Sequence, residues 1–296
     1  MPNQLEHKFA IRRIVKVTDD DYINALKIYN DTTPYEIKTP SNEITYWLEK
    51  QKTSTPFEIY AFILYLNNDV IGFSMTTYVK STKIVVDEYL AVYDRYRIQT
   101  IFLVFESLIQ NYYRDAGIEI SYYMTEISYK ESGKEIDRES RISMKMLCIE
   151  DYGKIDALYL TLPLGLENHE SNFVAYIYIK GVEPIKSISP KTYLSMVESL
   201  YYDYWFVWYS PFLTPSETTV YKKKIDNNFE LIKNNIEKYD ASLPVVHSNC
   251  NYLDIDAELS KSLIPVKNRI KAPLYLIIIP IIIVLPLLII WGYSKA

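Results

Sequence analysis

The last part of the chain is a long apolar run. No charged residue occurs between Ala272 and Ser294, and residues 274–291 read LYLIIIPIIIVLPLLIIW. As an α-helix this run would be roughly 27 Å long, close to the ~30 Å hydrocarbon core of a bilayer. Pro280 and Pro286 would kink such a helix, and membrane helices tolerate kinks when neighbouring groups satisfy the freed carbonyls. The sequence therefore predicts one C-terminal transmembrane helix at 272–294.

The charges beside this run predict its orientation. Lys267, Arg269 and Lys271 precede it, and only Lys295 follows it. Positive charge collects on the cytoplasmic side of a membrane helix. The N-terminal residues contain no apolar stretch like that of a signal peptide. We therefore expect a single-pass, tail-anchored membrane protein that contacts the bilayer through 272–294 and keeps its N-terminal domain in the cytoplasm.

Charge and residue usage exclude two classes of partner. The formal net charge of the 296-residue chain is -5, so its bulk charge would repel nucleic acid, and we expect no nucleic-acid partner. The three histidines, His7, His169 and His247, and the two cysteines, Cys148 and Cys250, are scattered along the sequence. They show no ligand spacing typical of a zinc site, so we expect no metal.

Hydrophobic periodicity and turn residues predict a mixed α/β (α+β) domain in the first 180 residues or so. The expected strands are 9–17, 57–66, 70–79, 83–92, 118–127, 155–162 and 173–179. The expected helices are 18–30, 41–50, 98–113 and 138–149. A turn at Asn67-Asn68-Asp69 joins the second and third strands into a hairpin.

Two segments in this order resemble the GNAT acyltransferase superfamily. They are ALKIYN at 25–30 and EYLAVYDRYRIQTIFLVFESLIQ at 88–110, the second combining a strand that ends in Leu-Ala-Val with a turn and a long helix. The resemblance covers about residues 8–182 and implies a GNAT-like domain at 1–182. Its implied fold is a mixed, mostly antiparallel sheet flanked by helices.

The resemblance also implies an acyl-CoA site at the start of the long helix. A helix N-terminus presents unpaired N–H groups and the positive end of the helix dipole, which suit a diphosphate. In the family, glycines bring this loop close to the ligand. Here Ile98, Thr100 and Phe102 stand at those positions, so the loop is degenerate, and Phe102 would crowd a diphosphate. The residues implied to bind acyl-CoA are Leu90, Ala91, Val92, Arg97, Ile98, Gln99, Thr100, Ile101 and Phe102.

Acyl transfer to an amine requires a base for the amine and an acid for the departing thiolate. Asp87 and Glu88 are neighbours on one predicted strand, so their side chains point to opposite faces. Glu88 is the candidate base, and a solvated strand carboxylate or an ion-pair partner is the simpler alternative. The position of the family's acid tyrosine falls on Ile149, and Tyr152, three residues later, is the candidate acid.

Residues beyond 182 lie outside the resemblance. Residues 183–240 form a predicted aromatic-rich helical extension, in which the crowding of aromatics between Tyr193 and Tyr209 is typical of a core or of a homodimer face. The sequence TPSE at 214–217 is a capping box that predicts a helix from Pro215 to about Tyr239. Residues 241–271 read as a linker to the predicted membrane helix.

Three functions are compatible with these features. The first is a membrane-anchored acyltransferase that moves an acetyl or other acyl group from acyl-CoA to an amine at the cytoplasmic face. The second is a catalytically inactive GNAT-like module that binds or senses a ligand while tethered to the membrane. In the third, the proline-containing tail itself oligomerises to permeabilise a membrane.

Overall fold

The computed structural model describes residues 8–33, 38–50, 54–128, 138–162, 173–239 and 241–247. The predicted membrane helix at 272–294 and most of the predicted linker lie outside these residues. Among the described helices, none is both long enough and apolar enough to span a bilayer.

A single twisted sheet organises the described chain. Its strands are hydrogen-bonded in the order β1-β2-β3-β4-β5-β8-β6-β10-β9, and β7 pairs with β8. The strands are β1 (Phe9–Arg13), β2 (Phe57–Leu66), β3 (Asp69–Val79), β4 (Ile84–Val92), β5 (Tyr122–Ser128), β6 (Gly153–Ile155), β7 (Tyr159–Thr161), β8 (Phe173–Lys180), β9 (Ser187–Ile188) and β10 (Leu243–Val246). The predicted mixed, mostly antiparallel sheet is confirmed, because β4 with β5 is the parallel pair in this set.

Local sequence explains the long central hairpin. Asn67 and Asn68 both adopt positive φ, at 51° and 72°, as a tight turn between antiparallel strands requires. Near the start of β3, Gly72 lies so close to β4 that an added Cβ would be 2.5 Å from the carbonyl oxygen of Ala91. A glycine at this position therefore permits the two strands to stay in register up to Val92.

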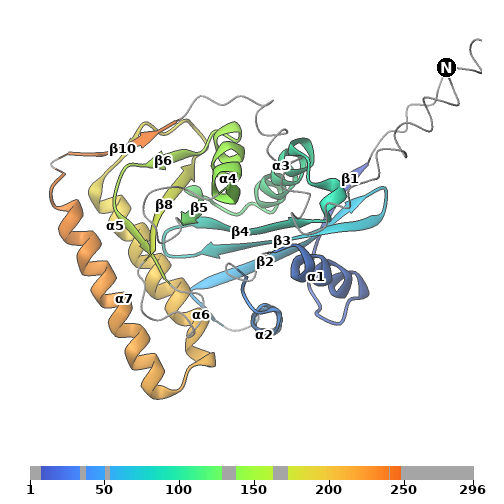
Figure 1. The fold of residues 1–296 in the computed structure, drawn as a ribbon, viewed down its shortest axis with the longest axis horizontal. Helices are drawn as coiled ribbons and strands as arrows, with labels where there is room; N and C mark the ends of the chain where they lie inside the picture. Colours follow the sequence, from blue (N-terminus) through green and yellow to red (C-terminus); the bar gives the residue numbers. More distant parts are fainter. Residues whose placement is uncertain are drawn as a thin grey trace, which may run out of the picture.

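Helices cover both faces of the sheet (Figure 1). In that view α1 and α2 lie on one side of β2, β3 and β4, and α3 and α4 lie on the other. The helical segments are α1 (Asp20–Thr32), α2 (Ser41–Lys50), η2 (Asp94–Tyr96), α3 (Gln99–Asp115), α4 (Arg138–Ile149), α5 (Pro190–Glu198), η3 (Ser199–Phe206), α6 (Val207–Tyr209), η4 (Ser210–Phe212) and α7 (Pro215–Ile236). The apolar residues accordingly form two main clusters, one on each face.

Strands β4 and β5 pair only briefly. Their parallel ladder covers Ile84–Val86 against Tyr122–Met124. From Asp87 to Val92 the described ladder of β4 continues on the β3 side alone, while the rest of β5 pairs with β8. At the point of divergence the Thr125 hydroxyl donates to the Asp87 carbonyl oxygen over 3.1 Å, so a side chain replaces the next backbone contact.

The aromatic extension is part of the same core. Trp208 is fully buried, donates from its indole nitrogen to Glu43 of α2 over 3.0 Å, and accepts at its carbonyl from the Trp47 indole over 3.1 Å. Tyr204 and Phe57 of β2 are in edge contact, with ring centroids 5.3 Å apart. The sequence allowed these aromatics to form either a core or a dimer face, and the described contacts place them in the core.

Two sequence expectations differ from the structure. Residues 243–246, expected in a linker, form β10 between β6 and β9, because Leu243 and Val245 alternate inward and bury against the main cluster. The single strand expected at 155–162 is divided into β6 and β7. Both differences come from long-range pairing, which local composition does not encode.

Replacing Trp208 with alanine should lower the free energy of unfolding by about 3–5 kcal/mol, because the cavity lies where the extension meets α2 and β2. Chemical denaturation of the full chain in detergent measures this loss. Val220→Ala, on the exposed surface of α7 at 61% exposure, is the control and should cost little. A Trp208→Ala loss no larger than that of the control would show that the extension contributes nothing to the core.

Candidate functional site

A β-bulge in β4 sets the directions of its side chains. Asp87 pairs with Thr76 and Tyr89 pairs with Met75, so Glu88 is the extra residue between two ladder positions. As a result Asp87 faces α3, whereas the side chains of Glu88 and Tyr89 both face α1 and the extension. The bulge lies directly after the last β4–β5 pair.

Glu88 lies among aromatic side chains of the extension. Burial is the main cause that raises its pKa, to about 8, and the nearby carboxyl of Glu126 on β5 raises it further. The Tyr204 hydroxyl donates to this carboxyl group and partly offsets the shift. One carboxyl oxygen of Glu88 is buried and has no hydrogen-bond partner in the part of the chain that the structure describes. A carboxyl group with these properties exchanges a proton near neutral pH, as a general base must.

Glu126 extends this carboxyl cluster along β5. It accepts from the Thr161 hydroxyl over 2.9 Å and from the Trp205 indole over 3.5 Å. Burial raises its pKa. The extension therefore contacts both carboxyl groups, one through Tyr204 and the other through Trp205.

Tyr152 approaches β4 from the opposite face. It is 2% exposed, and its hydroxyl lies 2.6 Å from Oδ2 of Asp87 and 3.1 Å from Oε1 of Glu106. Burial and these two carboxyl groups raise its pKa well above that of a free tyrosine. The two predicted catalytic residues thus flank the divergence of β4 and β5, Glu88 on one face and Tyr152 on the other.

Helix α3 begins shortly after the end of β4. Its N-cap residue, Ile98, has extended backbone angles, and no side chain caps the helix. The carbonyl of Ile98 accepts from Ile101 and, over a longer distance, from Phe102. By helix geometry the amides of Gln99 and Thr100 have no carbonyl of their own helix to bind. This end of α3 therefore has donors that can bind an anion.

Other residues of the predicted acyl-CoA loop are held by protein contacts. Arg97 donates to the Thr32 carbonyl at the end of α1 over 2.6 Å and forms a 3.4 Å ion pair with Asp94. Phe102 is partly buried and packs into the apolar cluster beneath α3. Arg97 thus joins the start of α3 to the end of α1.

The remaining predicted contacts at the end of β4 divide between the two faces. Ala91 belongs to the cluster on the α1 face, whereas Leu90 and Val92 belong to the cluster on the α3 face, as does Ile101 from the first turn of α3. The side chains are thus used for packing. For Leu90–Val92, the backbone edge turned away from β3 is the part that a ligand along β4 would meet.

Sequence reasoning missed three members of the site, Glu106, Glu126 and Tyr204, and it also missed the contact between Asp87 and Tyr152. Adjacent acids within the apolar strand IVVDEYLAV are a signal of buried carboxyl groups. Their partners come from α3, β5 and η3, which are distant in sequence.

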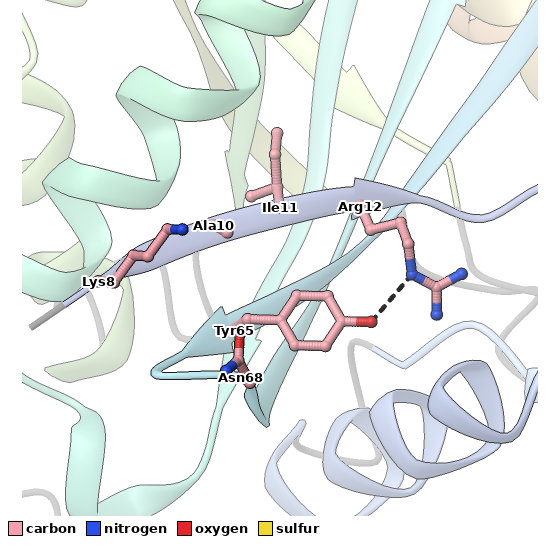
Figure 2. Close-up of a pocket in the computed structure, with 6 residues that line it drawn as sticks. All are labelled: Lys8, Ala10, Ile11, Arg12, Tyr65 and Asn68. Atoms are coloured by element: carbon pink, nitrogen blue, oxygen red, sulfur yellow. Dashed lines mark hydrogen bonds between the residues drawn. The ribbon is translucent and has the colours of Figure 1, made fainter.

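A separate hollow of about 290 Å³ lies at the edge strand β1, lined by Lys8, Ala10, Ile11, Arg12, Tyr65 and Asn68. Figure 2 shows Arg12 hydrogen-bonded to Tyr65 there. The Nε atom of Arg12 donates to the Tyr65 hydroxyl over 2.9 Å. The same guanidinium pairs with Asp19 and Asp21. Because two carboxylates already neutralise Arg12, its charge gives an anionic ligand little attraction, and we do not place the site there.

Comparison with known proteins gives structural similarity alone. No model of a known protein family matches the sequence, and no curated protein matches it. Among solved structures, a proposed GNAT-family acetyltransferase from Bacteroides thetaiotaomicron is 11% identical, with a TM-score of 0.47 over 65% of this chain and 96% of its own.

Two further structures are similar at lower scores. An N-acetyltransferase from Staphylococcus aureus Mu50 is 10% identical, with a TM-score of 0.42 over 59% of this chain and 97% of its own. The ribosomal-protein-S18-alanine N-acetyltransferase from Escherichia coli is 12% identical, with a TM-score of 0.37 over 60% and 95%. These scores are low, so the case for function rests on the residues of the site.

Glu88→Gln should stabilise the protein more at high pH than at low pH. The folded-state pKa of about 8 exceeds the ordinary value of 4.5, so native Glu88 lowers stability progressively as the pH rises from 4.5 to 8. A neutral glutamine removes this dependence, and we expect a gain of roughly 1–3 kcal/mol above pH 8 and almost none near pH 4.5.

Thermal unfolding of the full chain at both ends of this pH range measures the effect. Glu119→Gln, at a carboxylate that is 76% exposed and paired with Lys83, is the matched control. An equal response of the two variants to pH would contradict a buried, proton-binding Glu88.

Proposed function

We propose that this protein is a membrane-anchored N-acyltransferase, which moves an acetyl or other acyl group from acyl-CoA to an amine at the cytoplasmic face of a membrane. The observation that carries the proposal is the placement of Glu88 and Tyr152 on opposite faces of β4, where β4 leaves β5. The resemblance of residues 88–110 to the GNAT superfamily supports the same activity.

Acyl-CoA would bind along the edge of β4, with its diphosphate at the start of α3. Beyond Val86 that edge has left its ladder with β5, so its peptide groups can bind an extended ligand. The diphosphate would then lie at the uncapped start of α3, where the Gln99 and Thr100 amides are located. Arg97 would stabilise the loop through Thr32 rather than reach the phosphate itself.

The acceptor amine would bind beside Glu88. Its carboxyl group, with a pKa of about 8, is ionised in roughly a tenth of molecules at pH 7 and can accept the proton that the amine nitrogen loses on forming the amide. The neutral amine, formed by loss of the ammonium proton to water, attacks the thioester carbon. The nitrogen loses one more proton to Glu88 as the amide forms, and Tyr152 donates a proton to the departing thiolate. The aromatic side chains Tyr204 and Trp205, which contact the carboxyl cluster, would form the wall on the acceptor side.

The anchor in this proposal is the apolar run at 272–294, supported by its length and by the basic residues that precede it. The inactive binding module remains the alternative. It is favoured by the engagement of Arg97 with Thr32 and by the absence of glycine at 98, 100 and 102. Binding of acyl-CoA without transfer would identify it.

Gln99→Pro tests the diphosphate site without disturbing the helix. Proline fits the first helical position when the preceding residue is extended, as Ile98 is, and it removes one amide donor. Calorimetry with acetyl-CoA on the full chain in detergent should show binding that weakens about tenfold in the variant.

The control is Asp20→Pro, which places proline at the first position of α1 after the extended Asp19. It should leave binding unchanged. If the well-folded chain binds neither acetyl-CoA, CoA nor a longer acyl-CoA, the acyltransferase proposal is wrong.

Transfer to amines tests the role of Glu88. With a panel of primary amines, release of the CoA thiol should fall about 10²-fold or more in Glu88→Gln, because the general base is lost. The rate of the parent should rise with pH up to about 8, the pKa of this group, and the residual rate of the variant should lack that rise. A variant that keeps both the rate and the pH profile would exclude Glu88 as the base.

A further inference from the structure

A continuous series of polar contacts joins four elements on the α3 face of the sheet. Its centre is the Tyr152 hydroxyl between Asp87 of β4 and Glu106 of α3. From Glu106 the contacts continue outward: Gln110 donates to Glu106 Oε1 over 2.8 Å, and Lys180 of β8 donates to Gln110 Oε1 over 3.1 Å. Lys180 also pairs with Glu150, just beyond α4, over 3.0 Å.

The centre of this series implies an extra proton. A tyrosine hydroxyl has one proton and can donate to one of its two carboxyl neighbours. The contact with the second carboxyl group is a hydrogen bond only if that group is itself protonated. Two ionised carboxylates around one buried oxygen would instead repel each other in a region of weak screening. Asp87, Tyr152 and Glu106 therefore hold two protons among three groups.

The surrounding charges place the extra proton on Asp87. Burial and the charge of Glu150 raise the pKa of Glu106 as well. However, Glu106 accepts a hydrogen bond from Gln110, and the Lys180 ammonium lies just beyond, so a negative charge on Glu106 is partly stabilised. Among the described residues Asp87 has no such donor chain, and both burial and the charge of Glu106 raise its pKa well above the ordinary value.

The other charged groups near Asp87 act on its pKa in both directions, and burial remains the largest cause of the shift. Glu88, next to it on β4, raises the pKa of Asp87, whereas Lys180 lowers it less than burial raises it. Tyr113 of α3 and Tyr123 of β5 also lie near Asp87, and their own pKa values are raised chiefly by burial. Both tyrosines are thus neutral near pH 7 and add no charge.

We propose that Asp87 and Glu106 share one proton through Tyr152, and that this proton restores the Tyr152 hydroxyl after Tyr152 has protonated the CoA thiolate. The inference rests on the acyl transfer proposed above. The amine nitrogen bonds to the acyl carbon, and the carbon–sulfur bond breaks with its electron pair on sulfur. Sulfur takes the hydroxyl proton of Tyr152, Tyr152 takes the shared proton, and Glu88 holds the proton lost by the amine.

In this scheme Tyr152 is the residue that touches the leaving group. Asp87 and Glu106 are positioning residues, which act through Tyr152, and Gln110 and Lys180 hold Glu106. After each turnover the carboxyl pair is short of one proton and Glu88 has gained one, so exchange with water restores both without an additional reactant.

The shared proton is tested by carbon NMR on the full chain in detergent, with the aspartate carboxyl carbons labelled with ¹³C. Asp87→Asn identifies the signal of Asp87. At neutral pH the chemical shift of that signal should be that of a protonated carboxyl group. Glu106→Gln should move the titration of Asp87 to lower pH, because the neighbouring negative charge is removed. An ionised Asp87 at neutral pH, or a titration that ignores Glu106→Gln, overturns the inference.

The transfer role has a separate readout. In Glu106→Gln the alkaline limb of the pH–rate profile should move to lower pH, as the NMR titration does. We expect the rate at pH 8 to fall about tenfold. Glu119→Gln, outside the cluster, should move neither the limb nor the titration. A shifted titration with an unmoved limb refutes the role in transfer.

An inactive parent chain would refute that role together with the proposed function, and the NMR titration would still decide whether the proton is shared.

Tyr152→Phe checks that the hydroxyl connects the pair. Without the bridging oxygen, the titration of Asp87 should respond less to Glu106→Gln than it does in the parent chain. An equal response would show direct repulsion between the carboxyl groups with no shared proton.

Discussion

The site depends on the end of one short hydrogen-bond ladder. Strand β4 holds β5 over Ile84–Val86 and then continues beside β3 alone. The bulge at Glu88 follows immediately and restores the alternation of side chains one residue later. Without it, Tyr89 and every following residue of β4 would face the other side of the sheet. The end of the ladder exposes a backbone edge, and strand alternation places the carboxyl groups of Asp87 and Glu88 on opposite faces beside it.

Burial gives these carboxyl groups their chemical character. On one face Glu88 lies beneath the extension, and its pKa rises towards neutral pH. On the other face, Asp87 and Glu106 enclose the hydroxyl of Tyr152 in a region of low screening. The cost of burying charge is offset only in part by donors such as Tyr204 and Gln110. Such costly clusters are typical of functional sites, and here the two lie back to back across one strand.

Local sequence patterns predicted most of the elements. The helix at 41–50 and the strand at 57–66 occur with the predicted bounds, and the hairpin turn has the conformation that its asparagines favour. Helix α1 begins at Asp20, two residues after the expected start at 18, because Asp19 is the N-cap residue and accepts from the Asp21 amide. The strand β10 could not be predicted, since four residues with a proline gain their stability from β6 and β9. The candidate base and acid could be named from the resemblance, but their carboxyl neighbours could not.

The sequence by itself determined the alternation that makes the strands, the turn and capping residues that end them, and the presence of two acids in an apolar strand. It also determined the uncharged run at 272–294. Only the tertiary structure decided which groups surround those acids. Glu106, Glu126, Tyr152 and Tyr204 are distant in sequence, and their effect on a proton depends on distance and burial, which arise when the sheet, α3 and the extension pack together.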